Sequence, residues 1–216
     1  DGHDFAADAY RAGAMFSLTT KRIDGPCIVV KDVIEALSIL ATFVRKRLTN
    51  LTVIGITGSQ GKTSTKDLMS HMLSAVGPTV SPADSFNNDL GLPITLLECD
   101  EKTRFCILEM GARHSGDIAR LCGIAAPNIG VVLTVGTAHL GEFGSVQAIA
   151  ETKSELIQSL SEDGIAILGN YDVYTPAMQS LHSGRTISFG TVCEIRATEI
   201  EIREGRPHFD LVTPTG

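Results

Sequence analysis

The sequence has no tryptophan, few aromatic residues and no paired cysteine motif. Aromatic side chains make up 5% of the 216 residues, and the 5 cysteines form no C-x-x-C pair. The cysteines are scattered, most of them beside apolar runs, at Cys27, Cys99, Cys106, Cys122 and Cys193. This odd and dispersed set favours buried reduced thiols over a disulfide framework or a zinc site.

Long apolar runs and an excess of basic charge are lacking as well. No apolar run approaches the roughly 20 residues of a membrane-spanning helix, and no signal peptide can be recognised. The net charge of −7 argues against a nucleic-acid partner, because surfaces that bind nucleic acids are usually basic. We therefore expect a soluble, cytoplasmic protein without a membrane span, and we expect it to be a monomer.

The segments that are present alternate between strand-like and helix-like patterns, within a sequence that is 43% hydrophobic. The strand candidates are 52–57, 105–110, 129–135, 165–168 and 186–189. The helix candidates are 63–76, roughly 91–97, 117–122, 146–160 and 176–181. Such alternation predicts an α/β fold in which helices flank a mostly parallel sheet on both faces.

Both ends of the sequence follow other patterns. Segments 14–18 and 27–30 are candidate strands, and Asp32 is placed to cap a helix. The apolar stripe of that helix has 3-4 spacing, at Ile34, Leu37, Ala41, Val44 and Leu48. Segment 194–212 alternates around Glu204 and Gly205 and predicts an antiparallel hairpin. The ends therefore predict a small α/β piece before the sheet and a hairpin after it.

The segment 53–69, VIGITGSQGKTSTKDLM, has the order of strand, glycine-rich turn and helix start that a phosphate-binding loop requires. Gly58 and Gly61 let backbone N–H groups approach phosphate oxygens, Lys62 adds a point charge, and the Thr63 hydroxyl can hold a magnesium ion. The match to G-x-x-x-x-G-K-[ST] is incomplete, because its first glycine falls at Ile56. An ordinary strand-to-helix turn is the alternative, and a nucleoside triphosphate site is the prediction.

Other polar residues follow the strand candidates or lie near the predicted ligand edge. Glu109 ends the strand 105–110, where a P-loop enzyme keeps its second magnesium ligand. His139 alone reads as a hydrogen-bonded structural residue, and Lys153 as a helix-surface lysine among glutamates. Asn88 reads as a helix cap and Asn170 as a strand-end turn. Physical chemistry alone does not give these last four residues a functional role.

Five segments, in this order and spacing, resemble the Mur ligase family of peptidoglycan synthesis. They are TGSQGKTSTK, FNNDLGLPITLL, ILEMGARHSGDI, NIGVVLTVGTAHLGEFGS and AETKSEL. The second and third are most similar to the MurF-type members, which add D-alanyl-D-alanine to UDP-N-acetylmuramoyl-tripeptide. The opening DGHDFAADAYRAGA resembles the end of the N-terminal domain of MurE- and MurF-type enzymes. The family's loop has the form TG-[ST]-x-GK-[ST], which puts Gly58 in register.

The resemblance implies a role for each of these positions. The residues that would hold the ATP phosphates are Gly58, Ser59, Gln60, Gly61, Lys62, Thr63 and Ser64. Thr63 and Glu109 would bind one Mg²⁺, and His139 a second one shared with Lys153, which in the family is typically carbamylated. Asn88 would lie near the phosphates and the substrate carboxylate.

Asn170 would lie near the nucleotide, by the same resemblance. The family often has N-x-D-D at this place. The chain has Asn170-Tyr171-Asp172-Val173, so the second acid is missing. The resemblance therefore gives Asn170 a role and leaves the residues after it without one.

The reaction implied by the resemblance is ATP-driven amide bond formation through an acyl phosphate, with release of ADP and phosphate. Catalysis would fall to Lys62, Lys153, His139 and Asn88. Residues 1–48 would end the N-terminal UDP-substrate-binding domain, and 49–216 would form an incomplete central ATP-binding domain. The C-terminal domain would be absent from this chain, and the 216 residues alone are expected to be inactive.

Two alternatives remain open. Another Mur-type ligase, or one similar to folylpolyglutamate synthase, would keep the ATP motifs and change the substrates. A non-catalytic nucleotide-binding module would keep binding without ligation. Substrate screening and substitution of Lys153 or His139 discriminate among them.

Overall fold

A computed structural model describes residues 2–84, 86–138 and 140–215, and all structural statements refer to these residues. Its centre is a six-stranded parallel sheet with the strand order β4-β5-β3-β6-β7-β8. The strands are β3 (Thr52–Thr57), β4 (Thr79–Val80), β5 (Phe105–Glu109), β6 (Ile129–Val132), β7 (Ile165–Gly169) and β8 (Arg185–Phe189). The α/β fold with a mostly parallel sheet is confirmed.

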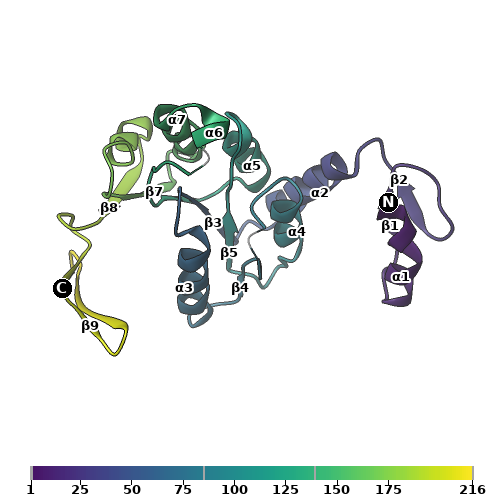
Figure 1. Ribbon diagram of the computed structural model, residues 1–216. Helices are drawn as coiled ribbons and strands as arrows, with labels where there is room; N and C mark the ends of the chain where they lie inside the picture. Colours follow the sequence, from purple (N-terminus) through teal and green to yellow (C-terminus); the bar gives the residue numbers. More distant parts are fainter. Residues whose placement is uncertain (1, 85, 139, 216) are drawn as a thin grey trace.

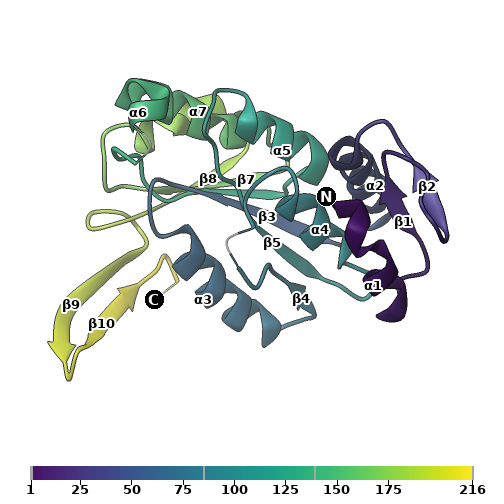
Figure 2. The ribbon, with the colours of Figure 1, turned by 45° about the vertical axis from the view of Figure 1, so that its right-hand side comes forward.

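Helices cover both faces of this sheet. They are α2 (Val33–Arg47), α3 (Lys62–Ser74), α4 (Gly91–Leu97), α5 (Asp117–Ala125), α6 (Leu140–Phe143) and α7 (Val146–Gln158), with the 3-10 helix η2 (Pro176–Leu181). Figure 2 shows α3 on one side of the strands and α5 and α7 on the other. The segment 176–181 was expected to be helical, and it forms the tighter 3-10 turn after Thr175, with Pro176 in its first turn.

The strands alternate their side chains between two apolar clusters. Val53 and Leu108 point into the larger cluster, which includes residues of α2, α4, α5 and α7. Ile54 and Ile107, their neighbours in sequence, point into a smaller cluster against α3. A strand that is buried on both faces therefore reads as a continuous apolar run, which is the pattern found in the sequence.

The first part of the chain forms a small unit that Figure 1 shows away from the sheet, at the far end of α2. It consists of η1 (Gly2–Phe5), α1 (Ala6–Arg11), β1 (Ser17–Thr19) and β2 (Cys27–Val29), and β1 and β2 pair in parallel. Asp32 caps α2 as predicted, accepting from the Glu35 N–H at 2.8 Å. The predicted apolar stripe is wrong at Ile34, which is 46% exposed, because the first half of α2 lies beyond the sheet.

The last part of the chain forms the predicted hairpin. Strands β9 (Arg196–Arg203) and β10 (Arg206–Val212) pair antiparallel around Glu204 and Gly205. Both turn residues have positive φ, which glycine adopts readily. Figure 1 shows the hairpin projecting from the β8 edge of the sheet. Within the described residues, no helix is both long and apolar enough to cross a membrane.

Candidate functional site

The cavity that contains the most predicted site residues lies beyond the carboxyl ends of β3 and β5. Its volume is about 450 Å³, and its lining includes Gly58, Lys62, Asn88, Arg113, Asp117 and Lys153. Ligands of open parallel sheets gather at this edge, because successive strands deliver their loops there. Residues from four separate predicted motifs therefore meet in one place.

The loop of residues 58–61, called the phosphate loop below, joins β3 to α3. Gly61 precedes the helix with φ = 83°, a left-handed conformation that glycine accepts without strain. The Lys62 ammonium donates to the Gly58 carbonyl at 2.9 Å. Burial lowers the pKa of Lys62, and the nearby Glu109 carboxylate opposes part of that shift. Lys62 thus places a positive charge beside the loop's backbone N–H groups.

The remaining residues of the predicted phosphate site differ in exposure. Gly58 is buried and Ser59 half-buried, whereas Gln60, Gly61 and Ser64 are exposed. Ser59 makes its contacts within the protein: its N–H donates to the Thr134 carbonyl at 2.9 Å, and its hydroxyl accepts from the Gly136 N–H at 2.8 Å. The role of these residues towards phosphate remains a prediction.

Thr63, which is half-buried, and Glu109, which is fully buried, form a pair at the base of the phosphate loop. The Thr63 hydroxyl donates to Glu109 Oε2 at 3.3 Å. Glu109 is 0% exposed, and its other oxygen, Oε1, is buried without a hydrogen-bond partner among the described residues. A buried, unpaired carboxylate oxygen is costly, and a hard cation such as Mg²⁺ satisfies it. The donor set therefore fits the predicted magnesium ion. Among the residues described, no group of three or more His, Cys, Asp or Glu side chains is arranged to hold a metal ion.

Lys153 approaches the cavity from α7 and is only 8% exposed. The helix-surface interpretation is therefore wrong, because α7 packs this side chain inward. Burial lowers the pKa of Lys153 to about 8, and the positive charge of Lys62 contributes to the shift. An amine with such a pKa is neutral in about a tenth of molecules at pH 7, a far larger share than for an ordinary lysine. His139, predicted to share a metal with Lys153, lies outside the described residues.

The two predicted asparagines are placed differently. Asn88 lines the cavity, and its Oδ1 accepts from the Leu90 and Gly91 N–H groups at 3.2 and 3.0 Å, so it also caps α4. Asn170 is not part of the cavity lining and donates to Cys193 Sγ at 3.5 Å. The cavity therefore brings together Lys62, Asn88 and Lys153, and leaves Asn170 outside its wall.

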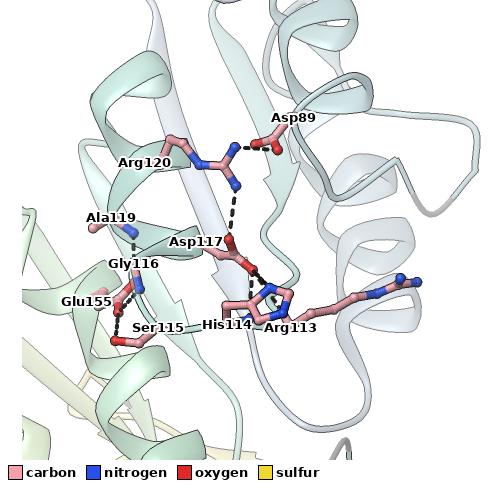
Figure 3. Close-up of polar contacts among 9 residues, drawn as sticks. All are labelled: Asp89, Arg113, His114, Ser115, Gly116, Asp117, Ala119, Arg120 and Glu155. Carbon is pink, nitrogen blue, oxygen red and sulfur yellow. Dashed lines mark hydrogen bonds and ion pairs between the residues drawn. The ribbon is translucent and has the colours of Figure 1, made fainter. Parts of the chain in front are cut away.

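One wall of the cavity is a network of charged side chains, shown in Figure 3. Asp117 Oδ2 accepts from the N–H groups of Arg113 and His114 at 2.9 Å each. Arg120 donates to Asp117 Oδ1 at 2.9 Å and also pairs with Asp89. Burial acts to raise the pKa of Asp117, but these donors lower it below its ordinary value. The network links the loop after β5 to the segment that carries Asn88.

Glu155 fixes the same wall from α7, two residues beyond Lys153. Its carboxylate accepts from the Gly116 N–H at 2.7 Å and from the Ala119 N–H at 2.9 Å, at the start of α5. Sequence reasoning gave Asp117, Arg120 and Glu155 no role. The i,i+3 spacing of Asp117 and Arg120 was a readable signal, but nothing in the sequence links Glu155 to α5.

Comparisons with known proteins agree with this geometry. The family described as Mur ligase middle domain matches residues 56–216. The UDP-N-acetylmuramoyl-tripeptide--D-alanyl-D-alanine ligase of Mycobacterium tuberculosis (strain ATCC 25618 / H37Rv) is 44% identical over 237 residues, covering 98% of this chain and 46% of its own length. This chain thus spans about half the length of the curated relatives it matches.

Two solved structures share the fold over the whole chain. A crystal structure of MurF from Acinetobacter baumannii has a TM-score of 0.89 at 36% identity, covering 100% of this chain and 48% of its own. The MurF ligase of Thermotoga maritima, in complex with ADP, has a TM-score of 0.83 at 32% identity, covering 99% of this chain and 50% of its own. With the phosphate loop, the Thr63–Glu109 pair and these matches in agreement, the chain belongs to the Mur ligase family.

Proposed function

We propose that this chain carries the ATP-binding and phosphoryl-transfer centre of a ligase that joins D-alanyl-D-alanine to UDP-N-acetylmuramoyl-tripeptide. The proposal is made for a protein of the relatives' full length, in which this centre sits within a larger enzyme. The observation that carries it is the meeting of Lys62 and Lys153 in one cavity, with Thr63 bonded to the buried Glu109 at the base of the phosphate loop. The names of the M. tuberculosis and T. maritima relatives supply the substrates and the nucleotide.

The reaction begins when the terminal carboxylate of the tripeptide attacks the γ-phosphorus of ATP. A carboxylate oxygen–phosphorus bond forms as the bond to ADP breaks, which gives an acyl phosphate. The amine of D-alanyl-D-alanine then attacks the acyl carbon, phosphate leaves, and the nitrogen loses a proton to solvent. Phosphate is a far better leaving group than the oxide that an unactivated carboxylate has to expel. No side-chain nucleophile is required.

The protein's part is to position two anions and to balance their charge. The Lys62 ammonium lies beside the Gly58 carbonyl, where the outer phosphates of ATP would meet the phosphate loop. Thr63 and Glu109 would hold a Mg²⁺ ion, which would supply positive charge to balance that of the phosphate oxygens. Asn88 uses its Oδ1 for the two contacts that cap α4, and its side-chain N–H groups donate to no other residue within the part of the chain that the structure describes.

Lys153 is proposed to act as its carbamate. The neutral amine forms a bond to the carbon of CO₂ and loses one proton, so a cation becomes an anionic oxygen ligand for a second Mg²⁺. The burial of Lys153 and its pKa of about 8 support this assignment, because they leave the amine available for the reaction. His139 completes the proposed ligand set.

The proposal also covers the organisation of the protein. Residues 1–48 would end the domain that binds the UDP-linked substrate, and 49–216 would belong to the ATP-binding domain. The separation of β1 and β2 from the sheet supports a division into two domains, and Ala41 in the second half of α2 already packs in the larger cluster of the sheet. The isolated chain is expected to be inactive, and the cytoplasmic location and monomeric state predicted from the sequence belong to the same proposal.

The test is phosphate release from ATP by the full-length protein, supplied with UDP-N-acetylmuramoyl-tripeptide with and without D-alanyl-D-alanine. Sustained release that requires both substrates, and that is lost in Lys62→Ala, is the expected result. Lys102→Ala, an exposed lysine in the turn before β5, is the matched control and should keep the wild-type rate. Binding of ATP without release in the presence of both substrates would favour a non-catalytic module or a different acid substrate.

A further inference from the structure

We propose that Asp172 is a positioning residue for the phosphate loop, acting through the segment 134–136 that follows β6. This segment is called the β6 segment below. The inference rests on the ATP site proposed above and concerns a residue for which neither the sequence nor the family resemblance supplied a role. Asp172 lies in the turn after β7, three residues beyond Gly169, and it reaches across to the neighbouring strand's loop.

The Asp172 carboxylate accepts five hydrogen bonds. Its Oδ1 accepts from the N–H groups of Tyr174 and Thr175, both at 2.8 Å, which closes its own turn. Its Oδ2 accepts from the Val135 N–H at 2.8 Å and the Thr134 hydroxyl at 3.0 Å, as well as from the Thr175 hydroxyl at 2.8 Å. Oδ1 thus serves the local turn, and Oδ2 joins that turn to the β6 segment.

The β6 segment in turn holds Ser59 from two sides. The Ser59 N–H donates to the Thr134 carbonyl at 2.9 Å, and the Ser59 hydroxyl accepts from the Gly136 N–H at 2.8 Å. Thr134 and Gly136 flank Val135, the residue whose N–H is bound by Asp172. A continuous chain of hydrogen bonds therefore leads from Asp172 to the second residue of the phosphate loop.

These contacts lie beyond the point where the backbone pairing of β3 and β6 ends. The last paired residues of β3 and β6 are Thr57 and Val132, and one further bond joins the Leu133 N–H to the Thr57 carbonyl at 3.0 Å. Beyond that point the phosphate loop and the β6 segment do not take part in the regular hydrogen bonding between β3 and β6. The single backbone bond from the Ser59 N–H to the Thr134 carbonyl and the side-chain contacts of Ser59 and Asp172 therefore set their separation.

The same contacts exclude Asp172 as a direct ligand of a metal ion or a nucleotide. A carboxylate has about four lone-pair sites, and the five donors occupy them. Asp172 is therefore committed to protein groups and does not ligate metal or nucleotide. Burial acts to raise its pKa, but the N–H donors, led by that of Val135, lower it below the ordinary value. The group remains ionised at neutral pH, with both oxygens able to accept.

The test uses Asp172→Asn in the full-length protein. Asparagine keeps an oxygen for the Tyr174 and Thr175 N–H groups, so the local turn survives. Its amide nitrogen cannot accept from the Val135 N–H, so the link to the β6 segment is lost. We expect the KM for ATP and the Kd for ADP to rise about five- to tenfold, as for one lost charge-assisted hydrogen bond. The KM for the UDP-linked substrate and the melting temperature should stay close to wild type.

Asp100→Asn is the matched control. Asp100 also closes a turn through its carboxylate, accepting from the Lys102 and Thr103 N–H groups at 2.9 and 3.0 Å. That turn precedes β5, so it lies at the amino edge of the sheet, away from the cavity. Asp100→Asn should leave the KM for ATP and the Kd for ADP unchanged.

Ser59→Ala provides a second and independent variant. It removes the hydroxyl that accepts from Gly136, and it should weaken ADP binding in the same direction. The double variant Asp172→Asn with Ser59→Ala should weaken binding by less than the product of the single effects, because both act on one path. Fully multiplicative effects would overturn the proposal, as would a fall in melting temperature with unchanged affinity for ADP. Since ADP binding is measured without the other substrates, the result stands whether or not the proposed ligation is correct.

Discussion

The two sides of the cavity are held in place by different kinds of contact. On the phosphate side, Ser59 and Asp172 bind backbone groups of the β6 segment, and no ion pair joins them to another of the described residues. On the side of α5, Asp117 and Glu155 also accept from backbone N–H groups, but Arg120 adds ion pairs to Asp89 and Asp117. Hydrogen bonds to backbone groups therefore fix the first side, and the second side has ion pairs that face solvent in addition to such bonds.

This difference indicates how tightly each side is held. Hydrogen bonds to backbone groups have short distances and narrow angular preferences, so they fix the phosphate loop closely. Phosphoryl transfer needs such accuracy, since a small misplacement of the reacting atoms lowers the rate. The Arg120 side chain is 53% exposed, and exposed ion pairs are weak and screened by salt. The α5 side should therefore tolerate substitution better than the phosphate side.

The largest expected effect is the loss of the carboxylate below the phosphate loop. Glu109→Gln keeps the size of the side chain and an oxygen for the Thr63 hydroxyl, but removes the negative charge at the proposed Mg²⁺ site. We expect phosphate release by the full-length protein to fall by about 10²–10³-fold at saturating ATP, the range for loss of one strong electrostatic contribution. Titration with Mg²⁺ should also require higher concentrations.

Glu101→Gln is the control for this experiment. Glu101 is exposed in the turn before β5, far along the strand from the cavity. It should retain the wild-type rate and magnesium dependence. A Glu109→Gln variant with wild-type magnesium dependence would contradict the assignment of Glu109 as a ligand.

The next effect concerns Lys153, which reaches the cavity between the two sides. If its carbamate is needed, protein depleted of CO₂ should lose activity about tenfold or more and should regain it when CO₂ is restored. Because the free amine has a pKa of about 8, the reactive neutral form increases as the pH rises through 8. At equal dissolved CO₂, recovery should therefore be slow near about pH 6 and fast near about pH 9. A recovery rate independent of pH would contradict carbamylation.

The sequence predicted the sheet and the phosphate side better than the α5 side, for a physical reason. Strands buried on both faces leave a continuous apolar run, and the phosphate loop requires glycine at particular positions, so both are visible locally. By contrast, β4 and α6 are too short to show a period, at two and four residues. Strand β6 was expected to continue to residue 135 but ends at Val132, because Thr134 gives its carbonyl to Ser59 instead of to a neighbouring strand.

For the site as well, the sequence predicted the residues of local motifs and missed those placed by tertiary packing. Lys62, Thr63 and Glu109 could be grouped from the order of motifs, because parallel strands deliver their loops to one edge. The inward position of Lys153 could not be read, since its neighbours Glu151 and Glu155 resemble those of a surface lysine. The contact of Glu155 with Gly116 could not be predicted from the sequence either, because it depends on how α7 packs against α5. Sequence patterns report local structure, and these contacts are set by tertiary packing.

On the α5 side, Glu155→Ala should have a moderate effect on stability. It removes the carboxylate that accepts from the Gly116 and Ala119 N–H groups at the start of α5. Loss of such a cap costs about 1–2 kcal/mol, and the urea midpoint should fall accordingly. Glu151→Ala, on the exposed side of the same helix, removes a single contact with Gln147 and should cost at most about 0.5 kcal/mol. Equal losses in the two variants would show that the contact with α5 contributes nothing.

The smallest effect is expected from Arg120→Ala, and its dependence on salt separates the two sides most directly. Arg120 pairs with Asp89 and Asp117 while remaining largely exposed. Its removal should therefore destabilise the fold by about 0.2–1 kcal/mol at low salt. The difference from wild type should shrink towards zero near about 1 M salt, where the Debye length is about 3 Å. The effect of Asp172→Asn on ADP affinity should instead persist at high salt, because short hydrogen bonds to the β6 segment are not screened in this way. Equal salt dependence in the two variants would mean that both sides are held by the same kind of contact.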